Sequence, residues 1–466
     1  MSMTDSRPLA ETWSPLPTLQ DHLTEGRTVR ESHPRESLAV LPEGERDPMG
    51  ILDRQDSTRV PELVPIRTQR MSESAFAFYR GTAALMAADL ARSPSSSIEV
   101  GSCGDAHVSN FGLFASPQRT LVFDLNDFDE SAWAPWEWDV KRLVTSIVIA
   151  GQSTSRDDKV VRDAALSAVR TYARALASGA KRSPLKRYYD HFDADAASDS
   201  LDPESAEALR KAVKDAEKRT SARAVRKLTS LDDAGRLVFG ETPPTMTHVD
   251  PRIELRINEF VAQYQRSANV DIRVLLQKYH VTDIARRVVG VGSVGTRCYL
   301  ISMSDGEGNA LILQGKEAGQ SVLVEYGGVE QPEAVARYIA ENGEGGRVVA
   351  MQRILQAVSD PFLGHLTGPS IDGPERSFYV RQFHDKKGGF DVDTLEDAAF
   401  GWYADACAST LARAHGQSPN AAVVAGYAGG GRVVGEAILE WSYAYADLSR
   451  ADWELFRRHR GVGEAG

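Results

Sequence analysis

Hydrophobic residues recur at helical spacing over most of the chain, and strand-like runs are short and few. The segment ESAFAFYRGTAALMAADLA, residues 73–91, predicts a helix, and the serine-rich break after it precedes a strand in IEVGSCGD. The run RTLVFDLNDFDE predicts a hairpin strand that ends in acidic residues, and WEWDVKRLVTSIVIAG predicts the helix that follows. We therefore expect these acidic side chains at the end of a strand.

Glycine-punctuated β-rich runs appear further along the chain, from about residue 283. The stretch ARRVVGVGSVGTRCYLISMSDGEGNALILQGKEA predicts an antiparallel meander of three strands. We expect a short helix at residues 321–326, a second helix around GRVVAMQRILQAV, a strand in SFYVRQF, and helices from residue 395 to the end.

This order of elements predicts an α+β protein divided into five segments. They are a mobile or extended arm (1–59), a part with the acidic strand end (60–156), a helical insertion and connection (157–282), a β-rich lobe (283–385) and closing helices (386–466).

Composition narrows the class of protein. A chain of 466 residues with 42% hydrophobic and 26% charged residues is typical of a folded protein of two or three domains. Its net charge of −11, without a dense basic block, argues against a nucleic-acid partner. The three cysteines, Cys103, Cys298 and Cys407, are far apart and show no metal-binding or disulfide spacing. With no signal pattern and no apolar run long enough to span a bilayer, we expect a cytoplasmic protein without a membrane partner.

The first chemical motif is GDAHVSN, in which Asp105 and Asn110 give the pattern D-x-x-x-x-N in a loop after a strand. In phosphoryl transfer such an Asp receives the proton of the acceptor hydroxyl, and the Asn binds Mg²⁺. His107 would orient the loop or the catalytic Asp, or simply bond to the main chain. Taken alone, the motif also fits an ordinary turn.

The second motif, FDLNDFDE, places Asp127 and Asp129 at the next strand end, where kinases carry their principal metal carboxylate. Carboxylate and amide oxygens suit Mg²⁺ bound together with substrate phosphates. A solvated acidic turn is the competing interpretation.

At this point the chain resembles small-molecule kinases of the aminoglycoside phosphotransferase type, which carry G-D-x-H-x-x-N, then D-[FW]-[DE], then a helix that begins near an Asp. The resemblance implies that Asp105 is the catalytic base, that Asn110 and Asp127 are metal ligands, and that Asp139 is a structural anchor. Cys103 departs from the pattern, because those enzymes usually have His there.

A phosphate clamp is expected in GVGSVGT, where Gly290, Gly292, Ser293 and Gly295 would let the backbone approach phosphates. A dinucleotide-binding loop would open a helix at the third glycine, whereas TRCYLISM continues as a strand. A flexible structural hairpin remains an alternative.

Lys316 lies in the middle of the third predicted strand, where a kinase holds the Lys that pairs the α- and β-phosphates. A charge that protects an edge strand is the alternative. We expect a carboxylate on the next helix to orient Lys316, with Glu325 as the first candidate and Glu330 and Glu333 as alternatives. Arg80, Arg142 and Arg381 could each reach a phosphate, but each is more often a structural ion-pair partner.

These parts occur in the reverse of the usual kinase order. The expected fold is therefore protein-kinase-like and two-lobed but circularly permuted, with SFYVRQF before the hinge and LARAHG on the helix preceding the catalytic loop. Over residues 60–456 the chain resembles the bacterial domain-of-unknown-function 2252 family through FAFYRGTA, GDAHVSNFG, FDLNDFDE, WEWDVKRL, VVGVGSVGT, LQGKEA and LARAH. That family implies no substrate.

The sequence thus predicts an ATP- and Mg²⁺-dependent phosphotransferase that acts on the hydroxyl of a small-molecule acceptor. Two alternatives are open. One is transfer of AMP from the same pocket, and the other is a nucleotide-binding module without catalysis. The product distinguishes the two reactions, because ADP indicates phosphoryl transfer and pyrophosphate indicates AMP transfer. The permuted fold itself predicts that Lys316 and Asp127 approach one another across a cleft.

Overall fold

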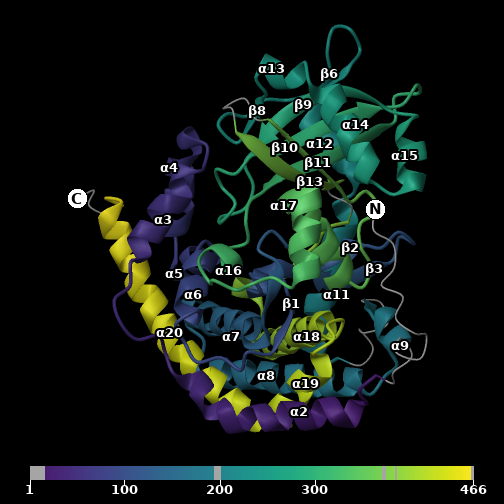
Figure 1. Ribbon diagram of the computed structural model, residues 1–466. Coiled ribbons are helices and arrows are strands. Elements are labelled where there is room, and N and C mark those ends of the chain that lie inside the picture. The colour runs from purple at the N-terminus through teal and green to yellow at the C-terminus, as the bar shows by residue number, and fades with distance from the viewer. Residues whose placement is uncertain (1–15, 194–200, 370–373, 384–385, 463–466) are drawn as a thin grey trace, which may run out of the picture.

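The fold joins a mainly helical part to a six-stranded antiparallel sheet that carries its own helices (Figure 1). It is seen in a computed structural model that describes residues 16–193, 201–369, 374–383 and 386–462. The architecture is α+β, as expected. None of the helices in the described ranges has both the length and the hydropathy that a membrane crossing requires.

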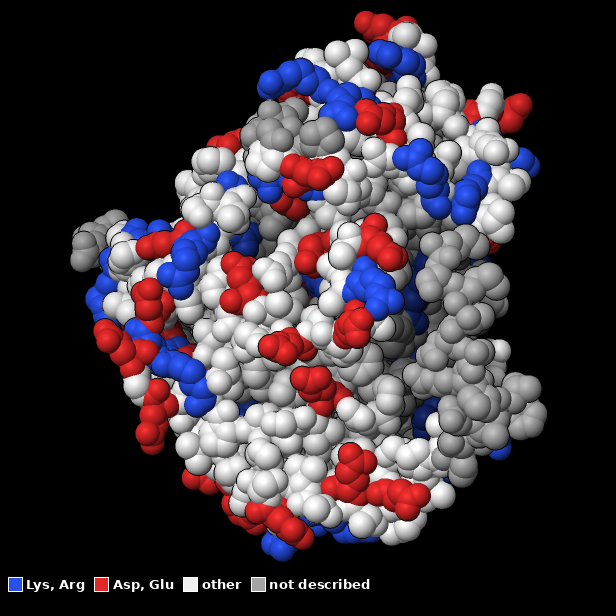
Figure 2. Space-filling model, viewed as in Figure 1, with Lys and Arg blue, Asp and Glu red and all other residues white. Residues whose placement is uncertain are grey.

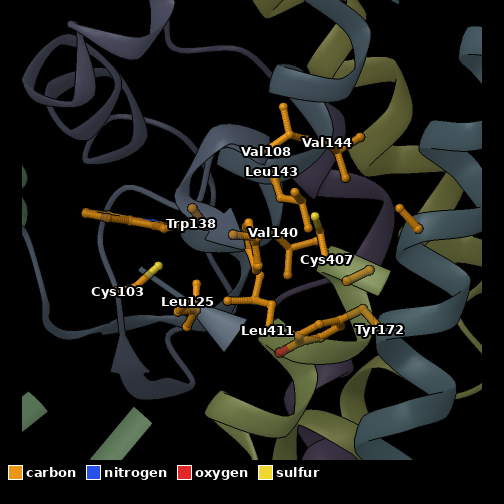
Figure 3. Close-up of a cluster of buried hydrophobic side chains, with 14 of the residues drawn as sticks. Cys103, Val108, Leu125, Trp138, Val140, Leu143, Val144, Tyr172, Cys407 and Leu411 are labelled. Carbon is orange, nitrogen blue, oxygen red and sulfur yellow. The ribbon is translucent and has the colours of Figure 1, made fainter. Parts of the chain in front are cut away.

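Helix α7 (Trp136–Ser153) lies at the centre of the helical part. Nearly all of it is buried, including the charged side chains of Glu137, Asp139, Lys141 and Arg142 in its first half, because other helices surround it. Helices α8 (Asp158–Ala180), α18 (Asp397–His415) and α20 (Arg432–His459) pack around it. Figure 3 shows Val140 and Leu143 of α7 beside Cys407 and Leu411 of α18, next to Cys103 and Val108 from the predicted catalytic loop. The hydrophobic core therefore supports that loop directly.

The N-terminal segment differs from the extended arm that we expected. Residues 16–59 form α2 (Leu19–Ser32), η1 (Arg35–Ala39) and α3 (Pro48–Ser57), while residues 1–15 lie outside the described ranges. Helix α2 crosses α19 (Ala421–Ala428) so closely that a Cβ at Gly26 would lie 2.0 Å from the carbonyl oxygen of Val423. Low hydrophobic periodicity misled the prediction, because this contact is made by backbone at glycine and needs no apolar stripe.

The sheet has the strand order β12 (Gly364–Pro369), β13 (Glu375–Gln382), β11 (Ala310–Ala318), β10 (Cys298–Ser304), β9 (His280–Arg287) and β8 (Met246–His248). The predicted meander is confirmed as β9, β10 and β11, with Lys316 paired to Cys298 and Gly315 to Tyr299. Helix α17 (Glu333–Leu355) packs against β12 and β13 and lies between the sheet and the helical part, whereas α14 (Ile257–Ser267) packs on β12 (Figure 1).

The region 157–282 is less uniformly helical than predicted. It contains α11 (Pro203–Lys218) and α12 (Ser221–Leu228), but also β5 (Phe192–Asp193), β6 (Thr229–Leu231), β7 (Leu237–Phe239) and β8. Its first helix, α8, is part of the core rather than an insertion, because its small side chains pack tightly against α18. Ala-rich segments occur both in helices that pack closely in a core and in exposed helices, so composition could not distinguish a core helix from an inserted one.

Two small sheets carry the predicted site loops. Strand β1 (Glu99–Ser102) pairs with β4 (Ala132–Pro135), and β2 (Phe111–Ala115) pairs with β3 (Leu121–Leu125). The helix predicted at residues 73–91 is two helices, α5 (Ala75–Arg80) and α6 (Ala83–Leu90), separated at Gly81. The other elements are η2 (Pro61–Leu63), α4 (Val64–Ser72), η3 (Val108–Asn110), α9 (Pro184–Tyr188), α13 (Pro251–Glu254), α15 (Val270–Leu276), α16 (Val322–Glu325) and η5 (Val392–Thr394).

Candidate active site

The GDAHVSN loop is held at its base by Asp139 on the first turn of α7. The backbone N–H groups of Cys103 and Gly104 donate to the two oxygens of this carboxylate at 2.8 and 3.0 Å. His415 Nε2 lies 3.1 Å from the same carboxylate, and its Nδ1 is 2.7 Å from the Tyr172 hydroxyl. Asp139 is therefore the anchor that the resemblance implied.

Gly104 is required by the close approach of the second motif. Its φ is 81°, and a Cβ there would lie 1.9 Å from the carbonyl oxygen of Glu130. Only glycine combines this conformation with this space. The two motifs are thus in backbone contact.

Asp105 is held by Arg142, whose Nε and Nη2 both lie 2.8 Å from its Oδ1. Burial raises the pKa of Asp105, and the charge of Arg142 opposes that rise. His107 Nε2 is 3.7 Å from Asp105 Oδ2, and burial holds the pKa of His107 well below its usual value, so this imidazole is neutral at pH 7. The Asp105 carboxylate therefore keeps one oxygen, Oδ2, for proton transfer.

Lys316 meets the acidic motif, as the sequence predicted. Its Nζ lies 2.7 Å from Asp129 Oδ2 and 3.9 Å from Asp127 Oδ1, and the side chain is 4% exposed. Although burial acts to lower it, the two carboxylates hold the pKa of Lys316 well above its usual value. Burial and repulsion by Asp129 raise the pKa of Asp127, whereas in Asp129 the effect of Lys316 outweighs burial and the pKa falls. The predicted approach of Lys316 and Asp127 is confirmed.

The expected pairing of Lys316 with Glu325 is wrong. Within the described residues the carboxylates that pair with Lys316 are Asp127 and Asp129. Glu325 is the last residue of α16, a single helical turn whose Val322 N–H donates to Glu130 Oε2 of the acidic motif at 2.8 Å. Glu325 lines a cavity that does not contain Lys316. Burial raises the pKa of Glu130 to about 7.

The long helix α17 contributes a cation to this region. Arg347 donates to the carbonyl oxygens of Asp129 and Gly319, at 2.9 Å each. It thereby ties the acidic motif to the end of the Lys316 strand.

The glycine loop lies between β9 and β10 and runs into a strand, which removes the dinucleotide-loop alternative. Gly290 and Gly295 have φ values of 70° and 92°, which favour glycine. The Val60 N–H donates to the Gly295 carbonyl at 2.8 Å, and a Cβ at Gly292 would lie 3.1 Å from the carbonyl oxygen of Arg80. The loop therefore rests on the N-terminal helices.

Two cavities meet at this loop. The larger, of about 590 Å³, contains Lys316, and the smaller, of about 400 Å³, contains Asp105, His107, Asp129 and Glu325. Five residues line both: Arg80, Asn110, Asp127, Gly290 and Ser293. The boundary between the cavities is therefore built from two of the three predicted metal-binding residues, Asn110 and Asp127, together with Arg80 and the glycine loop, while Asp129 lines only the smaller cavity.

Three cations of the site were set aside or missed by sequence reasoning. Arg80 makes neither an ion pair nor a hydrogen bond with its side chain within the described residues, and its Nε is buried without a partner there. Arg381 donates to Gln314 Oε1 at 3.1 Å and lines the larger cavity. Burial, and then repulsion by Arg381, lowers the pKa of Lys387 to about 7. For two of these cations the sequence did carry a signal, namely their position: Arg381 lies near the end of the predicted strand SFYVRQF, and Lys387 follows that strand.

The side-chain oxygen atoms of Asn110 and Asp127, at the boundary between the two cavities, suit a hard cation that is also coordinated by substrate phosphates. Asn110 donates through Nδ2 to the Asp105 carbonyl at 2.9 Å, which leaves its amide oxygen as an acceptor. In the part of the chain that the structure describes, no group of three or more His, Cys, Asp or Glu residues is arranged to hold a metal by itself. Mg²⁺ commonly takes one or two protein ligands and completes its shell with substrate phosphates and water, so Asn110 and Asp127 fit that ion.

Comparison with curated proteins and with solved structures found no match. One family model matches, described as an uncharacterized protein conserved in bacteria (DUF2252), and it covers residues 59–459. The GDAHVSN loop, the FDLNDFDE motif, the glycine loop and Lys316 all lie inside that range. Because the match covers most of the chain, the protein belongs to the bacterial domain-of-unknown-function 2252 family.

Proposed function

We propose that the protein transfers the γ-phosphoryl group of ATP to a hydroxyl of a small molecule, in a Mg²⁺-dependent site of permuted protein-kinase type. One observation carries the proposal. Lys316 and Asp129, 187 residues apart in the chain, form an ion pair at the boundary of two cavities that share Asn110 and Asp127.

The order of elements supports a kinase-like lobe. Strand β11 carries the Lys, α17 follows it, and β12 and β13 then lead into the segment before α18, as the Lys strand, the αC helix and the hinge follow one another in kinases. In kinases the catalytic loop follows these elements, whereas in this chain the corresponding GDAHVSN loop lies near the start of the sequence. Ser418, just after α18, accepts a hydrogen bond from the Gly101 N–H of β1 at 2.9 Å, so the two segments that permutation would separate are still adjacent.

The larger cavity suits the nucleotide. Its volume of about 590 Å³ lies in the usual range for small-molecule sites. Lys316, Arg381 and Lys387 line it and would neutralise the phosphates, while Gln382 and Phe383, at the end of β13, would contact the base.

The smaller cavity suits the acceptor, because Asp105 lines it. The acceptor oxygen forms a bond to the γ-phosphorus, the bond from that phosphorus to the β–γ bridging oxygen breaks, and ADP leaves. Asp105 takes the proton of the acceptor hydroxyl. A bound Mg²⁺ would neutralise phosphate charge, with Asn110 and Asp127 as its protein ligands.

Binding of ATP tests the nucleotide site. Calorimetry in the presence of Mg²⁺ should show that Asp127→Ala and Lys316→Ala each weaken binding by about tenfold or more. Lys316→Ala removes a cation that faces phosphate, and Asp127→Ala removes a carboxylate ligand of the Mg²⁺ that binds together with the phosphates. The exposed substitutions Asp233→Ala and Lys278→Ala are matched controls and should leave the affinity unchanged. If the folded natural protein does not bind ATP, the proposal is wrong.

The products separate the reaction types. Release of ADP is expected for phosphoryl transfer, and release of pyrophosphate would instead indicate transfer of AMP. Tight ATP binding without either product, across a panel of hydroxylated small molecules, would indicate a binding module.

A further inference from the structure

A third cavity, of about 450 Å³, lies at the junction of α11, α12 and the end of β9, outside the site described above. Five basic side chains and one acidic side chain line it: Lys218, Arg219, Arg223, Lys227, Arg287 and Asp215. This local excess of four positive charges contrasts with the net charge of −11 for the whole chain. On the face that Figure 2 shows, Lys and Arg side chains are interspersed with Asp and Glu side chains.

The basic side chains are left largely without acidic partners. Asp215 pairs with Lys218 at 3.1 Å. Within the described ranges no carboxylate forms an ion pair with Arg219, Arg223, Lys227 or Arg287. Four positive charges in one hollow, without an acidic partner among the described residues, indicate a site for an anion.

Helix α12 brings two of these charges to one face. Arg223 and Lys227 are four residues apart and therefore neighbours on the helix, an arrangement in which like charges repel and cost stability. Arg226 belongs to the same helix but does not line the cavity. The charge is thus concentrated toward the hollow.

Part of the cavity lining is apolar. Phe383, which belongs to a buried hydrophobic cluster, lines the cavity together with Leu228, a partly buried residue that packs against that cluster. The guanidinium of Arg287 stacks over the Phe383 ring at 5.0 Å from the centroid, and its Nη1 is buried without a hydrogen-bond partner among the described residues. A buried donor that lacks a partner favours an acceptor supplied by a ligand.

We propose that this cavity binds a compact oligophosphate, a small molecule that carries two or more linked phosphate groups. Arg and Lys are the side chains that proteins use for phosphate, and several are needed to neutralise linked phosphates. The volume of the cavity fits a small molecule, whereas a nucleic acid would need an extended basic stripe. Phe383 also lines the larger cavity, so the ligand would lie next to the candidate nucleotide site without occupying it.

Inorganic triphosphate, titrated by calorimetry in the presence of EDTA, tests this proposal separately from the proposed function. The double substitution Arg223→Gln with Lys227→Gln should weaken binding by roughly tenfold or more, since it removes two phosphate-binding charges. Arg226→Gln changes the charge of the same helix outside the cavity and should alter the affinity less than about twofold. Lys316→Met, in the candidate nucleotide site, should also leave it unchanged.

Several results would overturn the proposal. They are no binding of triphosphate to the natural protein, full affinity in the double variant, and loss of affinity in Lys316→Met alone. Stronger binding of a short single-stranded RNA at the same residues would assign the hollow to nucleic acid instead. Both residues of the double variant are exposed, and the single substitution Lys227→Gln, expected to weaken binding in the same direction, serves if the double variant does not fold.

Discussion

At the scale of single residues, the arginines near Asp105 differ in what they are free to do. Arg142 is buried, forms an ion pair with Asp105 and stacks 4.0 Å from the centroid of the Tyr79 ring. Its charge is therefore already neutralised by Asp105 of the GDAHVSN loop. Arg80 lines both cavities and has no side-chain partner within the described residues. In the proposed reaction, Arg80 is therefore the side chain that would stabilise the negative charge developing on the transferred phosphoryl group.

Replacing Arg80 tests this role. Arg80→Gln should lower the rate of Mg²⁺-dependent ADP release by about 10²- to 10³-fold and weaken ATP binding much less, because the contact is made mainly in the transition state. Arg226→Gln is the control of equal charge change. An unchanged rate in Arg80→Gln would remove Arg80 from the proposed reaction.

Lys141 is a buried charge on α7 that the proposed reaction does not use. Its side chain is fully buried, its Nζ lies 4.6 Å from the centroid of the Trp441 ring, and it has no hydrogen-bond partner within the described residues. Burial lowers the pKa of Lys141 from 10.5 to about 8, against the attraction of Glu137. Between these pH values the unfolded chain binds more protons, so the folded state gains stability as the pH rises from 8 to 10.5.

Lys141→Met should accordingly raise the free energy of unfolding at pH 7 by about 1–3 kcal/mol, since it removes a buried charge and keeps the volume. The gain should shrink as the pH rises through 8 to 10.5. Urea denaturation at several pH values measures it, with the exposed Lys278→Met as control. A gain that stays constant with pH would contradict the assignment to the Lys141 charge.

At the scale of elements, local pattern predicted most strands and helices but not their partners. The meander β9–β11 was predictable because glycines and a turn separate three β-rich runs. The division of the helix at residues 73–91 was missed because the break occurs at Gly81, where the backbone of one element approaches the glycine loop. Whether a glycine interrupts a helix depends on such a tertiary contact.

Asp139 joins helix α7 to the GDAHVSN loop, and its replacement tests how much this contact stabilises the fold. Asp139→Ala should lower the free energy of unfolding by about 3 kcal/mol, because it leaves two buried N–H groups of the loop and His415 without their acceptor. Asp163→Ala, on the exposed face of α8, should cost no more than about 1 kcal/mol. Chemical denaturation measures both, and equal costs would contradict the anchoring role.

At the scale of the whole molecule, the two ends of the chain close around the helical part. Arg46 donates to Asp89 on α6 and to Asp452 on α20, at distances of 2.6 to 2.9 Å, and all three side chains are largely buried. Residues 16–58, which precede the family match, are thus part of the same structure.

Breaking this link should destabilise the entire fold. Arg46→Ala should lower the free energy of unfolding by about 3 kcal/mol, since it leaves the buried Asp452 carboxylate without its cation and leaves Asp89 with Arg92 alone as a cation among the described residues. Arg27→Ala, on the exposed side of α2, is the control and should cost less than about 1 kcal/mol. A single unfolding transition shifted to lower denaturant is expected, whereas an unchanged midpoint would show that the N-terminal segment contributes little.

The sequence by itself determined where the chemical groups lie along the chain: the loop with Asp105 and Asn110, the acidic strand end at Asp127, and the Lys316 strand. These follow from local spacing, because hydrophobic periodicity and turn residues act over a few positions. Tertiary structure alone decided that Lys316 pairs with Asp129 rather than Glu325, that Arg80 keeps its charge free, and that residues 16–59 are helices packed on the core. Ion-pair partners, buried donors and cavities depend on which distant segments meet, and no short-range pattern encodes that.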